Sequence, residues 1–241
     1  MSGGRDGPKL PAMRLTIPHY FDFGAERGRV GGWLVKPSAW DAARDTTGPF
    51  GLPRSRSEWE SKALDPDVAA RARDIVSIAR EHGARAICSY GVGTGVLELG
   101  ISRAAPDLAL TCTDYAPRTV GRLQDLFPEA KVVGHDLLAD EPLAVDFHLL
   151  HRVDTEFPDR QLADVLARFQ QPVLVVPSVL LTWRLVLHEA LVRLRRPGAT
   201  RAGWLRSEAA FRALWRDRFH AADVTVGGAR AFLLTRDGAR S

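Results

Sequence analysis

Apolar residues from position 65 to the end of the chain follow two alternating patterns. Short runs, such as residues 86–88 and 173–176, are apolar at every position, which is typical of strands buried on both faces of a parallel sheet. Between these runs, apolar residues recur every three or four positions, as on the buried face of a helix. The alternation predicts a three-layer, doubly wound α/β fold.

The boundaries of these elements can be set from cap and turn residues. Asp65 and Pro66 begin a helix that ends at Gly83. The chain finishes with Gly227-Gly228 between two alternating runs, which predicts a terminal antiparallel hairpin in a mostly parallel seven-stranded sheet. The predicted strands are residues 84–89, 108–113, 131–133, 146–151, 172–176, 220–226 and 229–235, and the later helices are residues 96–105, 118–127, 158–169, 183–195 and 207–217.

Residues 1–64 have no sustained period and are rich in glycine, proline and aromatic residues. We therefore expect an irregular N-terminal cap with short helices over residues 1–64, and a main domain over residues 65–241. The aromatic residues either cover the core or line a substrate pocket, and the sequence leaves both interpretations open. They are His19, Tyr20, Phe21, Phe23, Trp33, Trp40, Phe50 and Trp59.

Composition is ordinary for a soluble globular protein, with 45% hydrophobic and 26% charged residues among 241. No apolar run resembles a secretory signal or is long enough to span a bilayer, so we expect a cytoplasmic protein without a membrane anchor. Cys88 and Cys112 fall in neighbouring predicted strands and are expected to be reduced core thiols.

The net charge of +4 comes mostly from arginines scattered along the chain. Their densest group would suit phosphates, but its position at a helix end favours a solvated basic terminus. We therefore expect a small-molecule partner rather than a nucleic acid, and the sequence leaves a homodimer open. The group consists of Arg193, Arg195, Arg196, Arg201 and Arg206.

The segment SYGVGTG, residues 89–95, joins a predicted strand to a predicted helix. Glycine is needed where a ligand lies against the backbone or where the chain turns sharply, because a Cβ would obstruct both. The spacing is G-x-G-x-G, whereas a dinucleotide site of the G-x-G-x-x-G type would need its third glycine at Val96. The loop therefore predicts a cofactor site that is not an NAD site.

Acidic residues follow the next two predicted strands. Asp114 lies about 20 residues beyond Gly95, where a ribose-binding acid is expected. Asp136, in the segment GHDL, can accept a hydrogen bond from the amino group of a base. Because the carboxyl ends of parallel strands share one edge, we expect the loop and both acids to form one ligand site. The alternative is a tight turn followed by a helix-capping Asp114.

With these motifs in this order, residues 65–240 resemble the class I S-adenosylmethionine (SAM)-dependent methyltransferases. The resemblance rests on SYGVGTG, TDYAP, GHDLL and DFHLLHRVDTEFPD, followed by the hairpin. It implies a Rossmann-like fold, SAM as cofactor and S-adenosylhomocysteine (SAH) as product. The implied cofactor-binding residues are Tyr90, Gly91, Gly93 and Gly95 for the methionine portion, Asp114 for the ribose, Tyr115, Asp136 and Leu137 for adenine, and His151.

One position departs from the family pattern. The family usually carries Asp or Glu two residues before the first glycine, where it helps to hold the ammonium group of SAM, and this chain has Ser89. Altered cofactor anchoring, weaker binding and loss of catalysis are three consequences that the sequence does not separate.

The candidate catalytic residues follow the fourth predicted strand. His151 is the expected general base, because its ordinary pKa lies near working pH. Asp154 and Glu156 are expected to orient His151 or bind a cationic substrate. The alternative is that His151 only bonds the loop and the acids complement the start of the next helix.

We therefore expect an enzyme that methylates nitrogen or oxygen of a small molecule. Two other functions stay open: a SAM-binding protein with weak or no activity, and an RNA or protein methyltransferase. No G-x-S-x-G, H-E-x-x-H or phosphate-binding loop occurs, which argues against hydrolases and nucleotide hydrolysis. The acids after the fourth predicted strand leave metal-assisted O-methylation open, but their spacing is not diagnostic, so no metal site is predicted.

Overall fold

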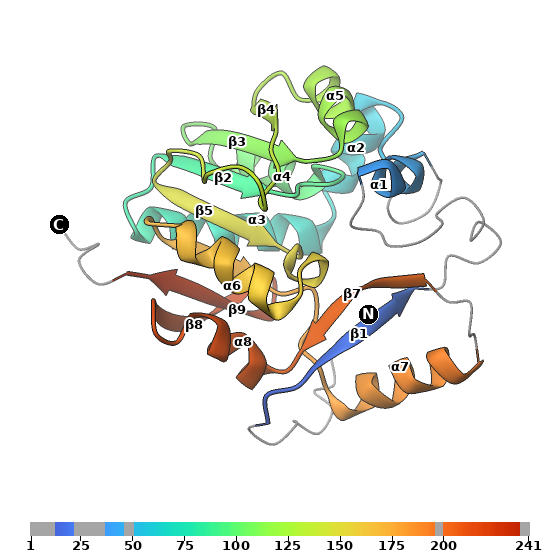
Figure 1. The fold of residues 1–241 in the computed structure, drawn as a ribbon. Coiled ribbons are helices and arrows are strands. Elements are labelled where there is room, and N and C mark those ends of the chain that lie inside the picture. Colours follow the sequence, from blue (N-terminus) through green and yellow to red (C-terminus); the bar gives the residue numbers. More distant parts are fainter. Residues whose placement is uncertain (1–12, 22–36, 46–50, 196–199, 237–241) are drawn as a thin grey trace.

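The computed structural model describes residues 13–21, 37–45, 51–195 and 200–236. Its centre is a seven-stranded sheet in the order β4-β3-β2-β5-β6-β9-β8. Figure 1 shows helices against this sheet and a two-stranded sheet beside it. The central strands are β2 (Ala86–Tyr90), β3 (Ala109–Asp114), β4 (Lys131–Gly134), β5 (Phe147–His151), β6 (Val173–Val176), β8 (His220–Val226) and β9 (Ala229–Thr235).

Strands β2 to β6 are parallel to one another, and β9 and β8 complete the sheet as an antiparallel hairpin. Gly227 and Gly228 form its turn with φ of +57° and +75°, a conformation that two-residue hairpins require and glycine adopts without strain. The predicted mostly parallel seven-stranded α/β sheet with its terminal hairpin is therefore confirmed.

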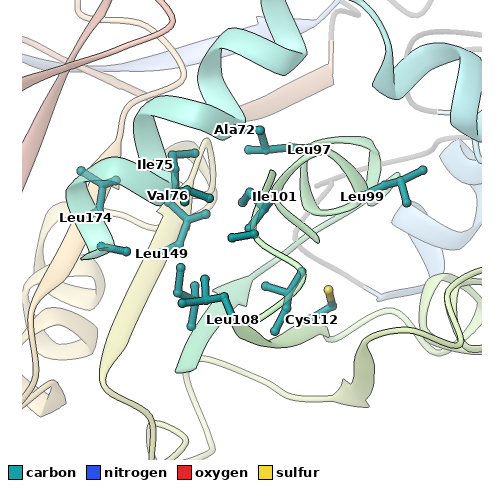
Figure 2. Close-up of a cluster of buried hydrophobic side chains, with 14 of the residues drawn as sticks. Ala72, Ile75, Val76, Leu97, Leu99, Ile101, Leu108, Cys112, Leu149 and Leu174 are labelled. Carbon is teal, nitrogen blue, oxygen red and sulfur yellow. The ribbon is translucent and has the colours of Figure 1, made fainter. Parts of the chain in front are cut away.

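Helices surround the sheet in two groups, each with its own hydrophobic cluster. Figure 2 shows part of the first cluster, in which side chains such as Ile75, Leu97 and Leu149 meet between helices and sheet. The helices of this side are α2 (Arg56–Ala63), α3 (Pro66–Glu81), α4 (Val96–Ala104) and α5 (Pro117–Leu126). The second cluster lies under α6 (Asp159–Arg168) and α8 (Glu208–Trp215).

Helix α3 begins as its sequence predicts. The Asp65 carboxylate accepts hydrogen bonds from the amides of Asp67 and Val68, and Pro66 occupies the first turn. These contacts satisfy donors that an uncapped helix would leave unpaired. The N-terminus of α3 is therefore fixed by its capping residues.

The N-terminal region is more regular than its composition indicates. Strand β1 (Thr16–Phe21) pairs antiparallel with β7 (Thr200–Arg206), and α7 (Trp183–Arg195) packs beside β1. The two strands lie far apart in the sequence, and neither β1 nor β7 is predicted from it. Trp59 of α2 is buried in the main core, and the domain boundary at residue 64 stays a prediction.

Cys88 in β2 and Cys112 in β3 are buried and unbonded to each other, as predicted. Burial raises the pKa of the Cys88 thiol to about 12, which keeps it protonated and unreactive.

Within the described ranges, no helix has both the length and the apolar character needed to cross a membrane.

Candidate cofactor site at the glycine loop

The glycine loop between β2 and α4 adopts a backbone that other residues rarely accept. Gly91, Gly93 and Gly95 have φ of +64°, +58° and +66°. A Cβ on Gly91 would lie 2.4 Å from a methyl group of Val153, and one on Gly95 would lie 2.8 Å from Leu123. These two glycines are therefore required by packing as well as by the turn.

Gly93 differs because its open side is occupied by a long polar side chain. A Cβ there would lie 2.6 Å from Nη2 of Arg44, which belongs to helix α1 (Pro37–Arg44). The backbone of Gly93, which has no side chain, thus faces the charged guanidinium group of Arg44. An arginine that the sequence did not identify lies against this part of the loop.

Asp114 at the end of β3 is tied directly to the loop. Its carboxylate accepts hydrogen bonds from the amides of Gly93 (3.0 Å) and Ala116 (2.9 Å). Burial raises the pKa of this carboxyl, while these bonds and the charge of Arg44 oppose the shift. The loop and Asp114 therefore form one site.

The residues expected around adenine lie at the same edge of the sheet. Asp114 pairs with Gly134 in the β3–β4 ladder, two residues before Asp136. Burial raises the pKa of Tyr115, and the nearby charges of Glu156, Asp114 and Asp136 raise it further. Leu137 is buried in the second cluster. The charges of the Asp114 and Asp136 carboxylates thus both act on the Tyr115 hydroxyl.

Tyr90 contributes its backbone to the loop, but its side chain points into the core. The ring is 1% exposed. Its hydroxyl lies 3.2 Å from Nδ1 of His148 and accepts a hydrogen bond from the amide of Leu143. The side chain of Tyr90 is therefore placed to support the loop.

A buried carboxylate lies directly behind the loop, and sequence reasoning did not find it. Ser89 Oγ donates a 2.7 Å hydrogen bond to Oε1 of Glu98, in the first turn of α4. Burial raises the pKa of Glu98 to about 7, Ser89 opposes the shift, and the charge of Asp114 adds to it. The position lacking the family's usual acid is thus bonded to an acid from the next helix.

The three candidate catalytic residues have different surroundings. The side chain of Asp154 is buried and accepts bonds from the amide and hydroxyl of Ser178. Burial lowers the pKa of His151 to about 3, and the charges that act on it are Arg152 and Arg71. His151 is therefore a neutral imidazole at physiological pH.

Glu156 is the member of this group that is bonded to helix α1. It ends the short 3₁₀-helix η2 (Asp154–Glu156) and accepts a 3.4 Å hydrogen bond from Nε1 of Trp40 on α1. Burial raises the pKa of Glu156 to about 8, Trp40 and Arg44 oppose the shift, and Asp114 adds to it. Helix α1 thus connects Glu156 to the cradle.

Other residues singled out in the sequence make contacts of different kinds. Trp59 donates a 2.9 Å bond from Nε1 to the carbonyl of Thr94 in the loop. His19 Nδ1 lies 2.9 Å from Glu189 on α7. Arg206, grouped above with solvated arginines, is fully buried and bonds Asp159 and the carbonyl of Asp154. Phe23, Trp33, Phe50 and Arg196 lie outside the described residues.

Across the described part of the chain, no three histidine, cysteine or carboxylate side chains gather as a metal site. The cradle instead combines bare backbone, two carboxylates and an aromatic ring. That set suits a ligand with hydroxyl groups, a flat base and a charged end.

No protein-family model matches the chain, and no curated protein matches it. Solved structures match its fold. Human N-acetylserotonin methyltransferase, solved with SAM, aligns with a TM-score of 0.55 at 18% identity, covering 76% of this chain and 57% of its own. PigF, solved with SAH, aligns with a TM-score of 0.59 at 18% identity, covering 84% of this chain and 60% of its own.

A third match, the mitomycin 7-O-methyltransferase MmcR, has a TM-score of 0.53 at 17% identity and covers 88% of this chain and 76% of its own. The chain spans less than two thirds of the length of the first two structures. At these identities the likeness concerns the fold. The chain has the fold of the class I SAM-dependent methyltransferases.

Proposed function

We propose that this protein is a SAM-dependent methyltransferase that acts on nitrogen or oxygen of a small-molecule acceptor. The observation that carries the proposal is the bond between Asp114 and the amide of Gly93, which joins a ribose-type acid to a bare glycine loop. The likeness to structures solved with SAM or SAH supports the same cofactor. We place the reaction in the cytoplasm, with residues 1–64 helping to cover the acceptor.

The residues present fit the adenosyl group. An ionised carboxylate accepts up to about four hydrogen bonds, so Asp114 keeps capacity for a ribose hydroxyl beside its bonds to Gly93 and Ala116. Tyr115 offers an aromatic face for adenine, and Asp136 an acceptor for its amino group. When bound, SAM supplies an electrophilic methyl group on its sulfonium, so the protein has mainly to align the acceptor.

We propose Glu156 as the base for an oxygen acceptor, because Trp40 of α1 bonds it and Arg44 of the same helix lies against the glycine loop. Its pKa of about 8 makes it a stronger base than an ordinary carboxylate while leaving part of it ionised near neutral pH. It takes the hydroxyl proton on its carboxylate as the oxygen attacks. Asp154 positions η2 through Ser178, and neutral His151 is left to bond the acceptor or the loop.

Oxygen is the acceptor atom that the solved neighbours favour. MmcR is a 7-O-methyltransferase, and the O-methyltransferase NcsB1 was solved with SAM and 2-hydroxy-5-methyl naphthoic acid at 21% identity and a TM-score of 0.50. We therefore propose a phenol-type or other hydroxylated acceptor before an amine.

A transfer assay tests this function. The protein is incubated with methyl-labelled SAM and a panel of phenols, hydroxy acids and amines, with Glu156→Gln and the exposed Arg160→Gln as the matched pair of variants. We expect label transfer to a hydroxylated compound, with a loss of roughly 100-fold in Glu156→Gln and none in Arg160→Gln. Transfer that is insensitive to Glu156, or found only on amines, overturns the proposed base.

Ser89 supports a second candidate, a SAM-binding protein without turnover, because the family's usual acid is missing at that position. Such a protein binds SAH but labels no acceptor in a whole-extract screen. Turnover on a single acceptor excludes it. An RNA methyltransferase predicts affinity for RNA that falls steeply with salt, which the same preparation can test.

A further inference from the structure

Helix α1 places one guanidinium group inside the cradle. The Nη2 atom of Arg44 lies where a Cβ on Gly93 would meet it at 2.6 Å. The group also stacks over the Trp40 ring, with 4.8 Å from Cζ to the ring centroid. Arg44 therefore lies against the part of the loop that the family resemblance assigns to the methionine portion of the cofactor.

The charges around Arg44 indicate which group of a ligand it would bind. Burial raises the pKa of both Asp114 and Glu156, and the positive charge of Arg44 opposes both shifts, so Arg44 lies within electrostatic range of two carboxylates. A guanidinium group forms its strongest contacts with carboxylates, through two parallel hydrogen bonds. A ligand that brings its own carboxylate beside Gly93 would offer Arg44 such a partner.

We propose that Arg44 binds the α-carboxylate of the amino-acid end of the cofactor, an inference that rests on the proposed function. In the ligand-free protein the Arg44 guanidinium interacts electrostatically with the carboxylates of Asp114 and Glu156. When the cofactor binds, Arg44 exchanges its interaction with these two acids for paired hydrogen bonds to the ligand carboxylate, while Asp114 uses its remaining acceptor capacity for the ribose.

The attachment of α1 permits this exchange. Its Asp41 carboxylate accepts a 3.2 Å bond from the amide of Arg118, at the start of α5, and Asp45 forms a surface ion pair with the Arg118 side chain. Among the α1 side chains whose exposure is described, none belongs to the buried core. Exposed ion pairs contribute little to stability, so the Asp45–Arg118 pair holds α1 only weakly.

Two ligands that differ only at the amino-acid end test the inference. SAH carries the α-carboxylate, and 5′-methylthioadenosine has the same adenosine and thioether without it. Calorimetric titration of Arg44→Gln is expected to show SAH affinity reduced roughly 10-fold to 100-fold, with methylthioadenosine affinity within about twofold of wild type. Arg160→Gln, the matched control, is expected to change neither.

Arg44→Lys keeps the charge but loses the paired bonds, so its SAH affinity is expected to lie between those of wild type and Arg44→Gln. Circular dichroism of each variant confirms that it is folded. An equal loss for both ligands, no loss for either, or tighter binding of both overturns the inference. If wild type binds neither ligand, the proposed function itself fails, which separates the two outcomes.

Discussion

Ser89 Oγ and the Glu98 carboxylate share a buried hydrogen bond of 2.7 Å, with the two residues 0% and 2% exposed. Ser89, which stands where the family resemblance implies an acid, is thus bonded to an acid from the first turn of the next helix. The positive end of the helix dipole favours an ionised Glu98, while burial favours the protonated form. With a pKa of about 7, the Glu98 carboxyl group behind the loop is therefore only partly ionised near neutral pH.

The pH dependence of stability tests this arrangement. Burial raises the pKa of Glu98 from 4.5 to about 7, so its favourable contribution is complete below pH 4.5 and is lost as pH rises through 7. The loss amounts to about 3 kcal/mol. We expect the free energy of unfolding of wild type, relative to Glu98→Gln, to fall by that order between pH 4.5 and 8 in urea titrations. A difference that does not change with pH contradicts the assignment.

Moving the acid back to the strand tests whether Glu98 serves the cofactor. We expect Glu98→Gln to bind SAH several-fold more weakly, and Ser89→Asp combined with Glu98→Gln to recover most of the affinity, because either site places a carboxylate behind the loop. Calorimetry measures both. A double variant no better than Glu98→Gln would show that the position of the acid matters more than its charge.

The glycines of the loop are expected to respond differently to alanine. Gly91→Ala creates a clash with Val153 at 2.4 Å and requires a left-handed backbone, so it should lower the free energy of unfolding by about 2 kcal/mol or more. Gly93→Ala meets only the flexible end of Arg44. It should therefore lose SAH affinity by at least about tenfold with a smaller loss of stability. Equal effects of both variants on both properties would contradict this division.

Arg206 is expected to be a structural residue. It is buried, its Nε lies 2.7 Å from Asp159, and its guanidinium bonds the carbonyls of Asp154 and Phe157. Arg206→Met leaves these groups without their donor and should destabilise the protein by about 3–5 kcal/mol. Urea unfolding measures the change, and a loss below about 1 kcal/mol would show that β7 and η2 are held by other contacts.

The pH profile of kcat/KM distinguishes the two candidate bases. If Glu156 takes the proton, the rate rises with pH and levels off above its pKa of about 8, because only the ionised form accepts a proton. His151, with a pKa of about 3, gives no inflection between pH 6 and 7. An inflection in that range, retained in Glu156→Gln and lost in His151→Gln, would reverse the assignment.

The central sheet was predictable because its signals are local. Each buried strand is a continuous apolar run, each helix has its own period, and Asp65 and Gly227-Gly228 mark ends through their backbone chemistry. The glycine loop and Asp114 followed from the same logic, because parallel strands end at one edge. The β1–β7 pair joins segments far apart in sequence, and no local pattern encodes such a pairing.

The residues that sequence reasoning missed act through three-dimensional contacts. Arg44 and Trp40 reach the loop from a helix in a region without clear periodicity. Glu98 looked like an ordinary charged residue in a helix, and only its side-chain direction brings it to Ser89. Arg206 belonged to a basic segment by composition, yet it is buried because the carbonyls of η2 surround it. The position of Glu98, three residues after Gly95, is the sequence signal by which it could have been found.

Titration of the protein with SAH tests the adenosyl cradle most directly. The account predicts one SAH bound per chain, with affinity reduced roughly 10-fold to 100-fold in Asp114→Asn, which keeps the shape of the side chain but removes its charge. Absence of binding to wild type, or binding that Asp114→Asn leaves unchanged, would contradict the account.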